Sequence, residues 1–155
     1  MAKSTPPPPH IRNKKARLRY QVLEKLECGL ALLGTEVKSL RQGRASLDEA
    51  FARITNGEIW LHGFHVPPYE HGNVHNHDPL RPRKLLLHNR QIAKLQPKVL
   101  QRGLTLIPLS VYFSPRGLAK VELALAQGKT HRDKRQDLRK RDDKREMDRV
   151  LRRRR

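Results

Sequence analysis

Histidines are the side chains in this sequence that could hold a transition metal. Five of the eight lie between residues 62 and 77: His62, His65, His71, His75 and His77. A zinc site needs three or four convergent ligands, yet the chain has no HExxH motif and no cysteine near this group. His62 and His65 would also point to opposite faces of a strand. We therefore expect loop and surface histidines and no metal site.

Catalytic groups are equally hard to assemble. Cys28, the single cysteine, lies in an apolar run where a thiolate is unfavourable, and no Ser stands in a Gly-x-Ser-x-Gly elbow. Gly128-Lys129-Thr130 lacks the upstream glycine of a phosphate-binding loop. The following carboxylates form no pair that would define an acid and a base: Glu24, Glu27, Glu36, Asp48, Glu49 and Glu58. We expect no catalytic residue, no cofactor and no enzymatic activity.

Basic side chains are in large excess. The 155 residues include 34 Lys and Arg against 15 Asp and Glu, a formal net charge of +19 with a pI near 11.1. The cations form four clusters, at residues 13–17, 38–44, 81–84 and 128–155. Separate clusters fit a large polyanion contacted at several places, so nucleic acid is the expected partner. Aromatic residues are few, which favours recognition of RNA shape through phosphates and 2′-hydroxyls over a stacking platform.

Other classes of protein fit less well. A charged surface without a partner would intersperse both signs of charge, and a membrane-binding tail would need an apolar face with bulky aromatics. The start of the chain has no apolar segment typical of a secretory signal, and no stretch is apolar enough to span a bilayer. The lone cysteine fits a reducing cytosol, so we expect a cytoplasmic protein.

Composition divides the chain into three parts. Residues 1–12, with Pro6–Pro9, predict a disordered lead-in, and residues 13–127 predict the folded domain. Residues 128–155 hold fourteen Lys or Arg against six Asp or Glu and no continuous apolar stripe. We expect this tail to be disordered when free and to gain structure on a polyanion.

The middle part predicts mainly β structure. Asn56-Gly57 is a strong hairpin signal between two of the strand-like runs, and Pro108 belongs at an edge or bulge. Residues 114–117 predict a turn, and residues 69–82 a long surface loop. The strand-like runs are residues 20–33, read as two short strands or one bent at Gly29, then 50–55, 58–65, 104–113 and 118–126.

Two regions predict short helices. Thr35 is expected to cap a helix over residues 36–41, ended by Gly43. A helical pattern from Leu85 to Leu100 predicts two short pieces, with Pro97 opening the second and Gly103 ending it. About six strands without βαβ alternation favour a compact antiparallel barrel, for which an oligonucleotide-binding barrel is one candidate.

Several motifs stand in a fixed order along the chain: Gly34–Arg41, Gly72-Asn73 with Asn76-His77, Arg83–His88, and Gly128-Lys129 followed by Asp133-Lys134-Arg135. Together these motifs resemble the SmpB family of bacterial SsrA-binding proteins. The resemblance runs from about Asn13 to Leu151. It implies an oligonucleotide-binding-type antiparallel β-barrel of about six strands, with two or three short flanking helices and a basic C-terminal tail.

The resemblance also implies a function. Members of this family bind the tRNA-like domain of transfer-messenger RNA and deliver it to ribosomes stalled without a usable stop codon. The body replaces the missing anticodon arm, while the tail becomes helical in the decoding centre and the empty mRNA channel. Alanyl-tRNA synthetase and elongation factor Tu are indirect partners, and the free protein is expected to be a monomer that catalyses no reaction.

Local alignment carries the RNA-binding positions of the family to Glu27, Leu86, His88 and Lys120, with Asn13, Arg17, Lys38, Arg83 and Lys84 as neighbouring candidates. The Lys and Arg side chains suit phosphate, and His88 and Asn13 suit sugar or base. Glu27 would orient a cation or accept from a base or hydroxyl, and Leu86 could equally belong to the core. The tail residues expected on the ribosome are Gly128, Lys129, Asp133, Lys134, Arg135, Arg139, Lys140, Arg141, Val150 and Leu151.

The chain departs from the family pattern at a few positions. Gln127 stands where Lys is frequent, and Arg132, preceded by His131, stands where an aromatic residue or His is common before the Asp. An Arg guanidinium can also stack on a base. Two rival functions remain: a small basic ribosomal or ribosome-assembly protein, and an RNA nuclease.

Overall fold

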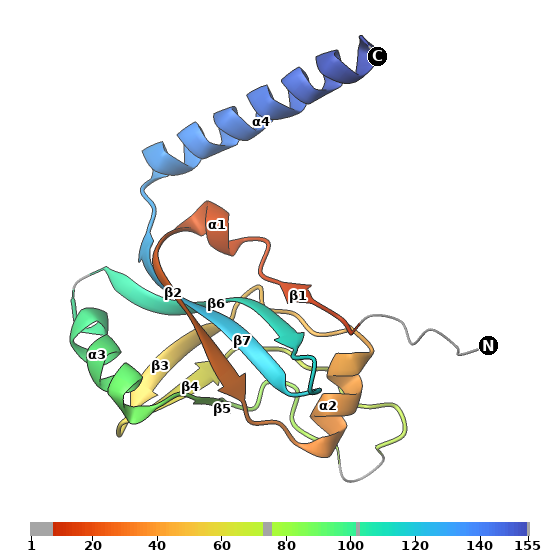
Figure 1. Ribbon diagram of the computed structural model, residues 1–155, viewed down its shortest axis with the longest axis vertical. Coiled ribbons are helices and arrows are strands. Elements are labelled where there is room, and N and C mark those ends of the chain that lie inside the picture. The colour runs from red at the N-terminus through yellow and green to blue at the C-terminus, as the bar shows by residue number, and fades with distance from the viewer. Residues whose placement is uncertain (1–7, 73–75, 102, 155) are drawn as a thin grey trace.

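The computed structural model describes residues 8–72, 76–101 and 103–154, in which one antiparallel sheet of seven strands is accompanied by four helices (Figure 1). Most of the predicted lead-in, including Pro6 and Pro7, lies outside the described residues. The elements are β1 (Ile11–Arg12), α1 (Ala16–Arg19), β2 (Tyr20–Leu30), α2 (Gly34–Arg41), β3 (Phe51–Thr55), β4 (Glu58–His62), β5 (Arg83–Leu86), α3 (Asn89–Val99), β6 (Leu104–Phe113), β7 (Ala119–Gly128) and α4 (His131–Arg153).

Six of the strands form a partly closed ring. The strand order is β1-β6-β3-β4-β5-β2-β7, and β6 also pairs with β7. Two joins are short, because β3 meets β6 at the single pair Ala52–Leu106 and β2 meets β5 at two pairs. The main hydrophobic core lies inside the ring and receives side chains from every strand of it, including Cys28, Ile59, Leu85, Leu106 and Val121.

A smaller apolar cluster lies on the outer face of β6 and β7. It consists of Ala16 from α1 together with Ile107, Leu109, Ala124 and Ala126. Two neighbouring strands therefore carry apolar residues on both faces, one toward the ring interior and one toward α1. This second cluster fixes α1, which the sequence did not predict, against the outside of the ring.

The strand predictions are largely confirmed. The hairpin β3–β4 turns at Asn56 and Gly57, whose φ angles of 52° and 74° suit the tight primed turn that Asn-Gly favours. β2 is one long strand with an irregularity between Val22 and Glu24 rather than a break at Gly29. Pro108 lies at a register shift of β6, as its missing N–H requires.

The helix predictions need three corrections. Thr35 lies inside the first turn of α2 and does not cap it, because Leu33 occupies the cap position. Leu85 and Leu86 belong to strand β5, where pairing with β2 and β4 overrides the helical spacing. Pro97 does not divide the second helix, because it lies near the end of α3, where its ring removes one backbone hydrogen bond while Ile92 and Leu95 keep the helix packed.

The tail forms the 23-residue helix α4, which leaves the body at the end of β7 and projects away beyond α1 (Figure 1). None of the residues of α4 is buried. β7 continues through Gly128, so the last strand reaches one residue past the predicted domain end at residue 127.

Candidate nucleic-acid interface

Leu86, Gly29, Lys120 and Tyr112 lie in one row across four neighbouring strands, β5, β2, β7 and β6. The register pairs Leu86 with Gly29, Gly29 with Lys120, and Lys120 with Tyr112. The sequence neighbours of Gly29 lie in the core, so the pleat places this row on the outer face. Two predicted RNA contacts, Leu86 and Lys120, thus lie on either side of one glycine.

The side chain of Leu86 belongs to the surface, which resolves the alternative that it is a core residue. It is 52% exposed, whereas Leu85 before it is buried. A Cβ built on Gly29 would lie 3.1 Å from the Cβ of Leu86, tighter than ordinary contact. Because Gly29 has no side chain, Leu86 can lie directly over it. The exposed leucine offers an apolar surface to a base or a ribose.

Glu27 joins the row from the same face of β2, two residues before Gly29. Its carboxylate accepts a hydrogen bond from the hydroxyl of Tyr112, and its Oε1 lies 3.9 Å from Nζ of Lys120. Burial raises the pKa of Tyr112 to about 12, and the hydrogen bond to Glu27 acts in the same direction. Tyr112 thus stays a donor at neutral pH and leaves other lone pairs of the exposed carboxylate to a ligand.

An open pocket of about 430 Å³ lies beside this row. His88, just before α3, lines the pocket. Its backbone N–H donates to Oε1 of Gln91 at 3.3 Å, which orders the start of the helix. The residues lining the pocket are Glu27, Gly29, Leu86, Leu87, His88, Gln91 and Lys120. It therefore joins a cation, a carboxylate, an imidazole and an apolar side chain, which together can bind phosphate, hydrogen-bond a base edge and cover a ribose.

Two other predicted phosphate ligands, Lys38 and Lys84, lie outside this pocket. Nζ of Lys84 donates to Oε1 of Glu58 at 2.8 Å. Nζ of Lys38, on α2, lies 5.4 Å from the centroid of the Tyr69 ring. Both ammonium groups remain accessible, but each already has a partner in the protein.

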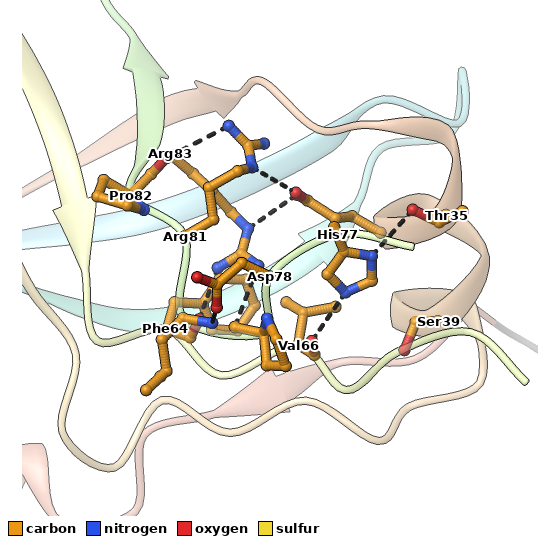
Figure 2. Close-up of polar contacts among 12 residues, drawn as sticks. Thr35, Ser39, Phe64, Val66, His77, Asp78, Arg81, Pro82 and Arg83 are labelled. Carbon is orange, nitrogen blue, oxygen red and sulfur yellow. Dashed lines mark hydrogen bonds and ion pairs between the residues drawn. The ribbon is translucent and has the colours of Figure 1, made fainter. Parts of the chain in front are cut away.

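Arg83 is placed differently from the prediction, because its side chain is fully buried. Its Nη1 donates to the carbonyl of Phe64 at 2.6 Å (Figure 2). Its Nε donates to one oxygen of Glu36 at 2.8 Å, and Arg81 donates to the other oxygen. Burial lowers the pKa of Arg83. Burial alone would raise the pKa of Glu36, but the hydrogen bonds from both arginines outweigh it and hold that pKa below its ordinary value. Arg83 therefore fastens α2 to the sheet and offers nothing to a phosphate.

His77 fastens the chain at Val66 to α2 in the same region. Its Nδ1 lies 2.9 Å from Oγ1 of Thr35, and its Nε2 lies 2.8 Å from the carbonyl oxygen of Val66 (Figure 2). A carbonyl can only accept, so Nε2 carries the proton and Nδ1 accepts from the Thr35 hydroxyl. This buried histidine of the Asn76-His77 motif is structural.

Asn13 is also structural. Its side chain donates to the carbonyl of Pro108 at 3.0 Å and accepts from the backbone N–H of Ala16 at 3.2 Å, and it is 9% exposed. These bonds hold the segment before α1 against β6. Arg17, one residue after Ala16, remains exposed.

Two tail residues predicted to contact the ribosome are engaged within the protein. Lys129 donates from Nζ to the carbonyl of Arg17 at 2.7 Å and pairs with Asp137, whose pKa this hydrogen bond lowers. Asp133 and Thr130 cap α4 reciprocally through their side chains and backbone N–H groups. Both residues thus set where α4 begins and how it leaves α1.

The remaining tail positions present their side chains to solvent or are only partly covered. Val150 and Leu151 are 44% and 58% exposed. Lys134 is partly covered, and the exposed cations are Arg135, Arg139, Lys140 and Arg141.

Sequence reasoning missed Tyr112 and Gly29, which complete the row around Lys120. No motif singles out either residue, since their role comes from cross-strand register between segments far apart in sequence. The described part of the chain holds no cluster of three or more His, Cys, Asp or Glu suited to a metal; His75 and Asn73 lie outside it. Among the same residues, no helix has the length and hydrophobicity to cross a bilayer.

Comparison with known proteins agrees with the resemblance. The family model described as "SmpB protein" matches residues 10–153. The SsrA-binding protein of Desulforamulus reducens is 57% identical over 140 residues, covering 90% of this chain and 87% of that protein. The SsrA-binding protein of Thermobifida fusca is 58% identical over 144 residues, covering 93% and 89%.

A solved structure shows the same fold. A chain of the structure described as "tmRNA-SmpB: a journey to the center of the bacterial ribosome" superposes with a TM-score of 0.68 at 50% identity, covering 79% of this chain and 86% of that chain. The family model covers nearly the whole sequence, and the relatives match at high identity along most of their own length. This chain belongs to the SmpB family of SsrA-binding proteins.

Proposed function

We propose that this protein is an RNA-binding factor of bacterial trans-translation that binds the tRNA-like domain of transfer-messenger RNA and delivers it to stalled ribosomes. One observation carries the proposal most directly: Glu27, Leu86, His88 and Lys120 come from separate segments of the chain and line one open pocket. They do so in a chain that is 57% identical to an SsrA-binding protein.

The chemistry of the pocket suits an unpaired or exposed nucleotide in a folded RNA. Lys120 binds the phosphate, Leu86 covers the ribose or base, and His88 hydrogen-bonds a sugar or base edge. Glu27, oriented by Tyr112, accepts from a base amine or a 2′-hydroxyl. A generic duplex supplies the phosphate alone, so these contacts favour a specific RNA shape.

The resemblance to this family also indicates which class of β-barrel the ring belongs to. We assign the six-stranded ring to the oligonucleotide-binding-type barrels, because it is antiparallel, small and partly open. The resemblance also supplies the ribosome, alanyl-tRNA synthetase and elongation factor Tu as members of the same RNA complex. It places a monomeric protein in the cytoplasm.

The two ends of the chain are proposed to have separate roles. Residues 1–12 form a Pro-rich lead-in, of which Ile11 and Arg12 pair with β6. Residues 128–155 act as a basic tail that is disordered when free and helical on the ribosome, in the decoding centre and mRNA channel. The supporting observation is that α4 buries none of its 23 residues. A helix without a packed face depends on its cap and its local pairs, so binding to rRNA phosphates would supply most of its stabilisation.

The test is a comparison of two RNAs. Fluorescence anisotropy at moderate salt would measure the affinity of the full chain for a tRNA-like-domain transcript and for a generic duplex of equal length. We expect clear preference for the transcript, reduced by Lys120→Ala and His88→Ala. Lys94→Ala is the matched control, because Lys94 is exposed on α3 outside the pocket. Equal affinity of the unmodified protein for both RNAs would contradict the proposal and favour a small ribosomal or assembly protein.

A further inference from the structure

A second basic site lies where the body meets the tail, against β6 and β7 beside the segment that leads into α1. Its base is the segment from β1 to α1. Ile11 and Arg12 pair with Val111 and Ser110 of β6, and the backbone N–H of Asn13 donates to Leu109 at 2.8 Å. With both side-chain bonds of Asn13 added, this segment is firmly held, and it presents Arg12, Lys14 and Arg17 to solvent.

The tail helix contributes from the other side. The backbone N–H of Lys129 donates to the carbonyl of Arg19 at 2.9 Å, and its Nζ bonds the carbonyl of Arg17 and Asp137. These contacts bring the first turns of α4 beside α1. Arg141 follows Asp137 by four residues and therefore lies on the same face of the helix, toward the body.

Arg12, Lys14, Arg17 and Arg141 line one cavity of about 350 Å³. Within the described ranges, none of these four cations has an ion pair within 4.0 Å, whereas most carboxylates of the body do. The carboxylate in the cavity, Glu122, is already paired with Lys25 at 3.4 Å. Four like charges around one space repel each other, and an anion between them would relieve that repulsion.

We propose that this cavity holds a phosphodiester group of the bound RNA, gripped jointly by the body and by the docked tail helix. The three arginines can bind a phosphate in the bidentate manner that the guanidinium group favours. Because Arg141 belongs to α4, a phosphate in the cavity also stabilises the docked position of the helix. The site reads charge and not sequence, so it adds affinity without adding preference.

This inference rests on the proposed RNA-binding function, and the test separates the two. The salt dependence of binding would be measured by anisotropy with the tRNA-like-domain transcript and with a generic duplex, for the full chain and for Arg141→Gln, Arg17→Gln and the double variant. Each single change is expected to weaken binding to both RNAs by the same factor and to reduce the slope of log affinity against log salt by about one. The double variant should lose less than the sum of the two, because both residues hold one phosphate.

Arg149→Gln is the matched control, since it makes the same chemical change on the same helix, two turns beyond the cavity. Arg149 lines no part of the cavity that Arg141 joins. The proposed phosphate site would be wrong if Arg141→Gln changed the salt slope no more than Arg149→Gln does. It would also be wrong if the losses of affinity in the double variant were strictly additive. If the unmodified protein showed no preference for the tRNA-like domain, the proposed function would be wrong. The salt slopes of the variants measured with the generic duplex would still test the phosphate site. Circular dichroism of each variant would confirm that the fold and the helix are retained.

Discussion

The carboxylate of Glu36 and the guanidinium of Arg83 face each other at 2.8 Å, and neither side chain is exposed. The second oxygen of Glu36 is held by Arg81 at 2.7 Å. Arg83 begins β5, whose second last residue is Leu85 in the core, and Glu36 lies in the first turn of α2. One buried ion pair thus joins a helix to the strand that carries Leu86 into the pocket that we propose binds RNA.

Removing one partner of this pair should be costly. Arg83→Ala leaves the Glu36 carboxylate buried with a single remaining partner, so we expect the free energy of unfolding to fall by about 3–5 kcal/mol. Urea denaturation followed by tryptophan fluorescence would measure it. Lys84→Ala, one residue on, removes a half-exposed pair and should cost no more than about 1 kcal/mol. Similar small losses for both variants would contradict a structural role for Arg83.

The same pair predicts how stability depends on pH. The pKa of Glu36 is lower in the folded protein than in the unfolded chain, where a Glu titrates near about 4.3. Its ionised form is therefore the stabilised one, so its contribution is full above about pH 4.3 and is lost as the pH falls through the folded pKa. Urea denaturation between pH 7 and pH 3 should show this fall, and Glu36→Gln should flatten it. The hydrogen bond from Arg44 also lowers the pKa of Glu70, but this pair is exposed, so Glu70→Gln should flatten the curve much less than Glu36→Gln.

Local signals in the sequence predicted local structure well. Asn56-Gly57 gave the hairpin, and Pro108 gave the irregularity in β6, because each depends on the backbone chemistry of one or two residues. Pro97 misled the helix prediction, since a proline near the end of a helix costs little when Ile92 and Leu95 hold the helix to the core. Tertiary packing decided that case, and packing is not visible in spacing.

For the functional residues, too, the sequence located segments correctly but did not show how the side chains are placed. The motifs located the right segments, but they did not distinguish a surface cation from a buried one. Arg83 and Lys84 are adjacent and chemically alike, yet strand pleating turns one inward to Glu36 and the other outward. Whether a residue of a family motif contacts RNA or supports the fold is decided by the register of β5 against its neighbours.

Gly29 offers a test of the place that Leu86 occupies. Gly29→Ala puts a methyl group 3.1 Å from Leu86, which can move because it is half exposed. We expect less than about 1 kcal/mol change in stability, but a weaker preference for the tRNA-like domain, as for Leu86→Ala. In a Leu86→Ala background the glycine change should add little. Gly34→Ala, where an added Cβ meets nothing within 4 Å, is the control. Unaltered preference in both Gly29→Ala and Leu86→Ala would remove Leu86 from the RNA contact.

Lys129 and Asp137 control the start of the tail helix. Asp137→Asn removes the charge that pairs with Lys129, so we expect the first turns of α4 to open more often from α1. Amide hydrogen exchange over residues 129–141 should be faster, while the exchange of β6 and β7 stays unchanged. Asp142→Asn is the matched control. Among the described residues, Asp142 is paired only with Arg145, at 4.0 Å, and both side chains are largely exposed. Equal exchange in the two variants would show that the Lys129 contact does not hold the helix.

Truncation should separate RNA recognition from the action on the ribosome. The structure sets the cut after Thr130, because β7 runs to Gly128 and its last residues pair with Tyr20 and Gln21 of β2. A chain of residues 1–130 keeps the whole ring and the pocket with Lys120, so its preference for the tRNA-like domain should persist. Its affinity for every RNA should fall by a common factor, because Arg141 and the phosphate contact that we propose for it are lost.

The same truncated protein should fail to support tagging on stalled ribosomes in a reconstituted translation assay, since the basic helix that follows the ring is missing. Lys120→Ala should behave in the opposite way. It should bind RNA weakly and without selectivity, but at saturating protein concentration the complex is driven to form and tagging should be restored. Comparing anisotropy and tagging for these two variants separates the pocket from the tail. If truncation also abolished the preference between the two RNAs, the tail would take part in recognition itself, and the division between ring and tail would be wrong.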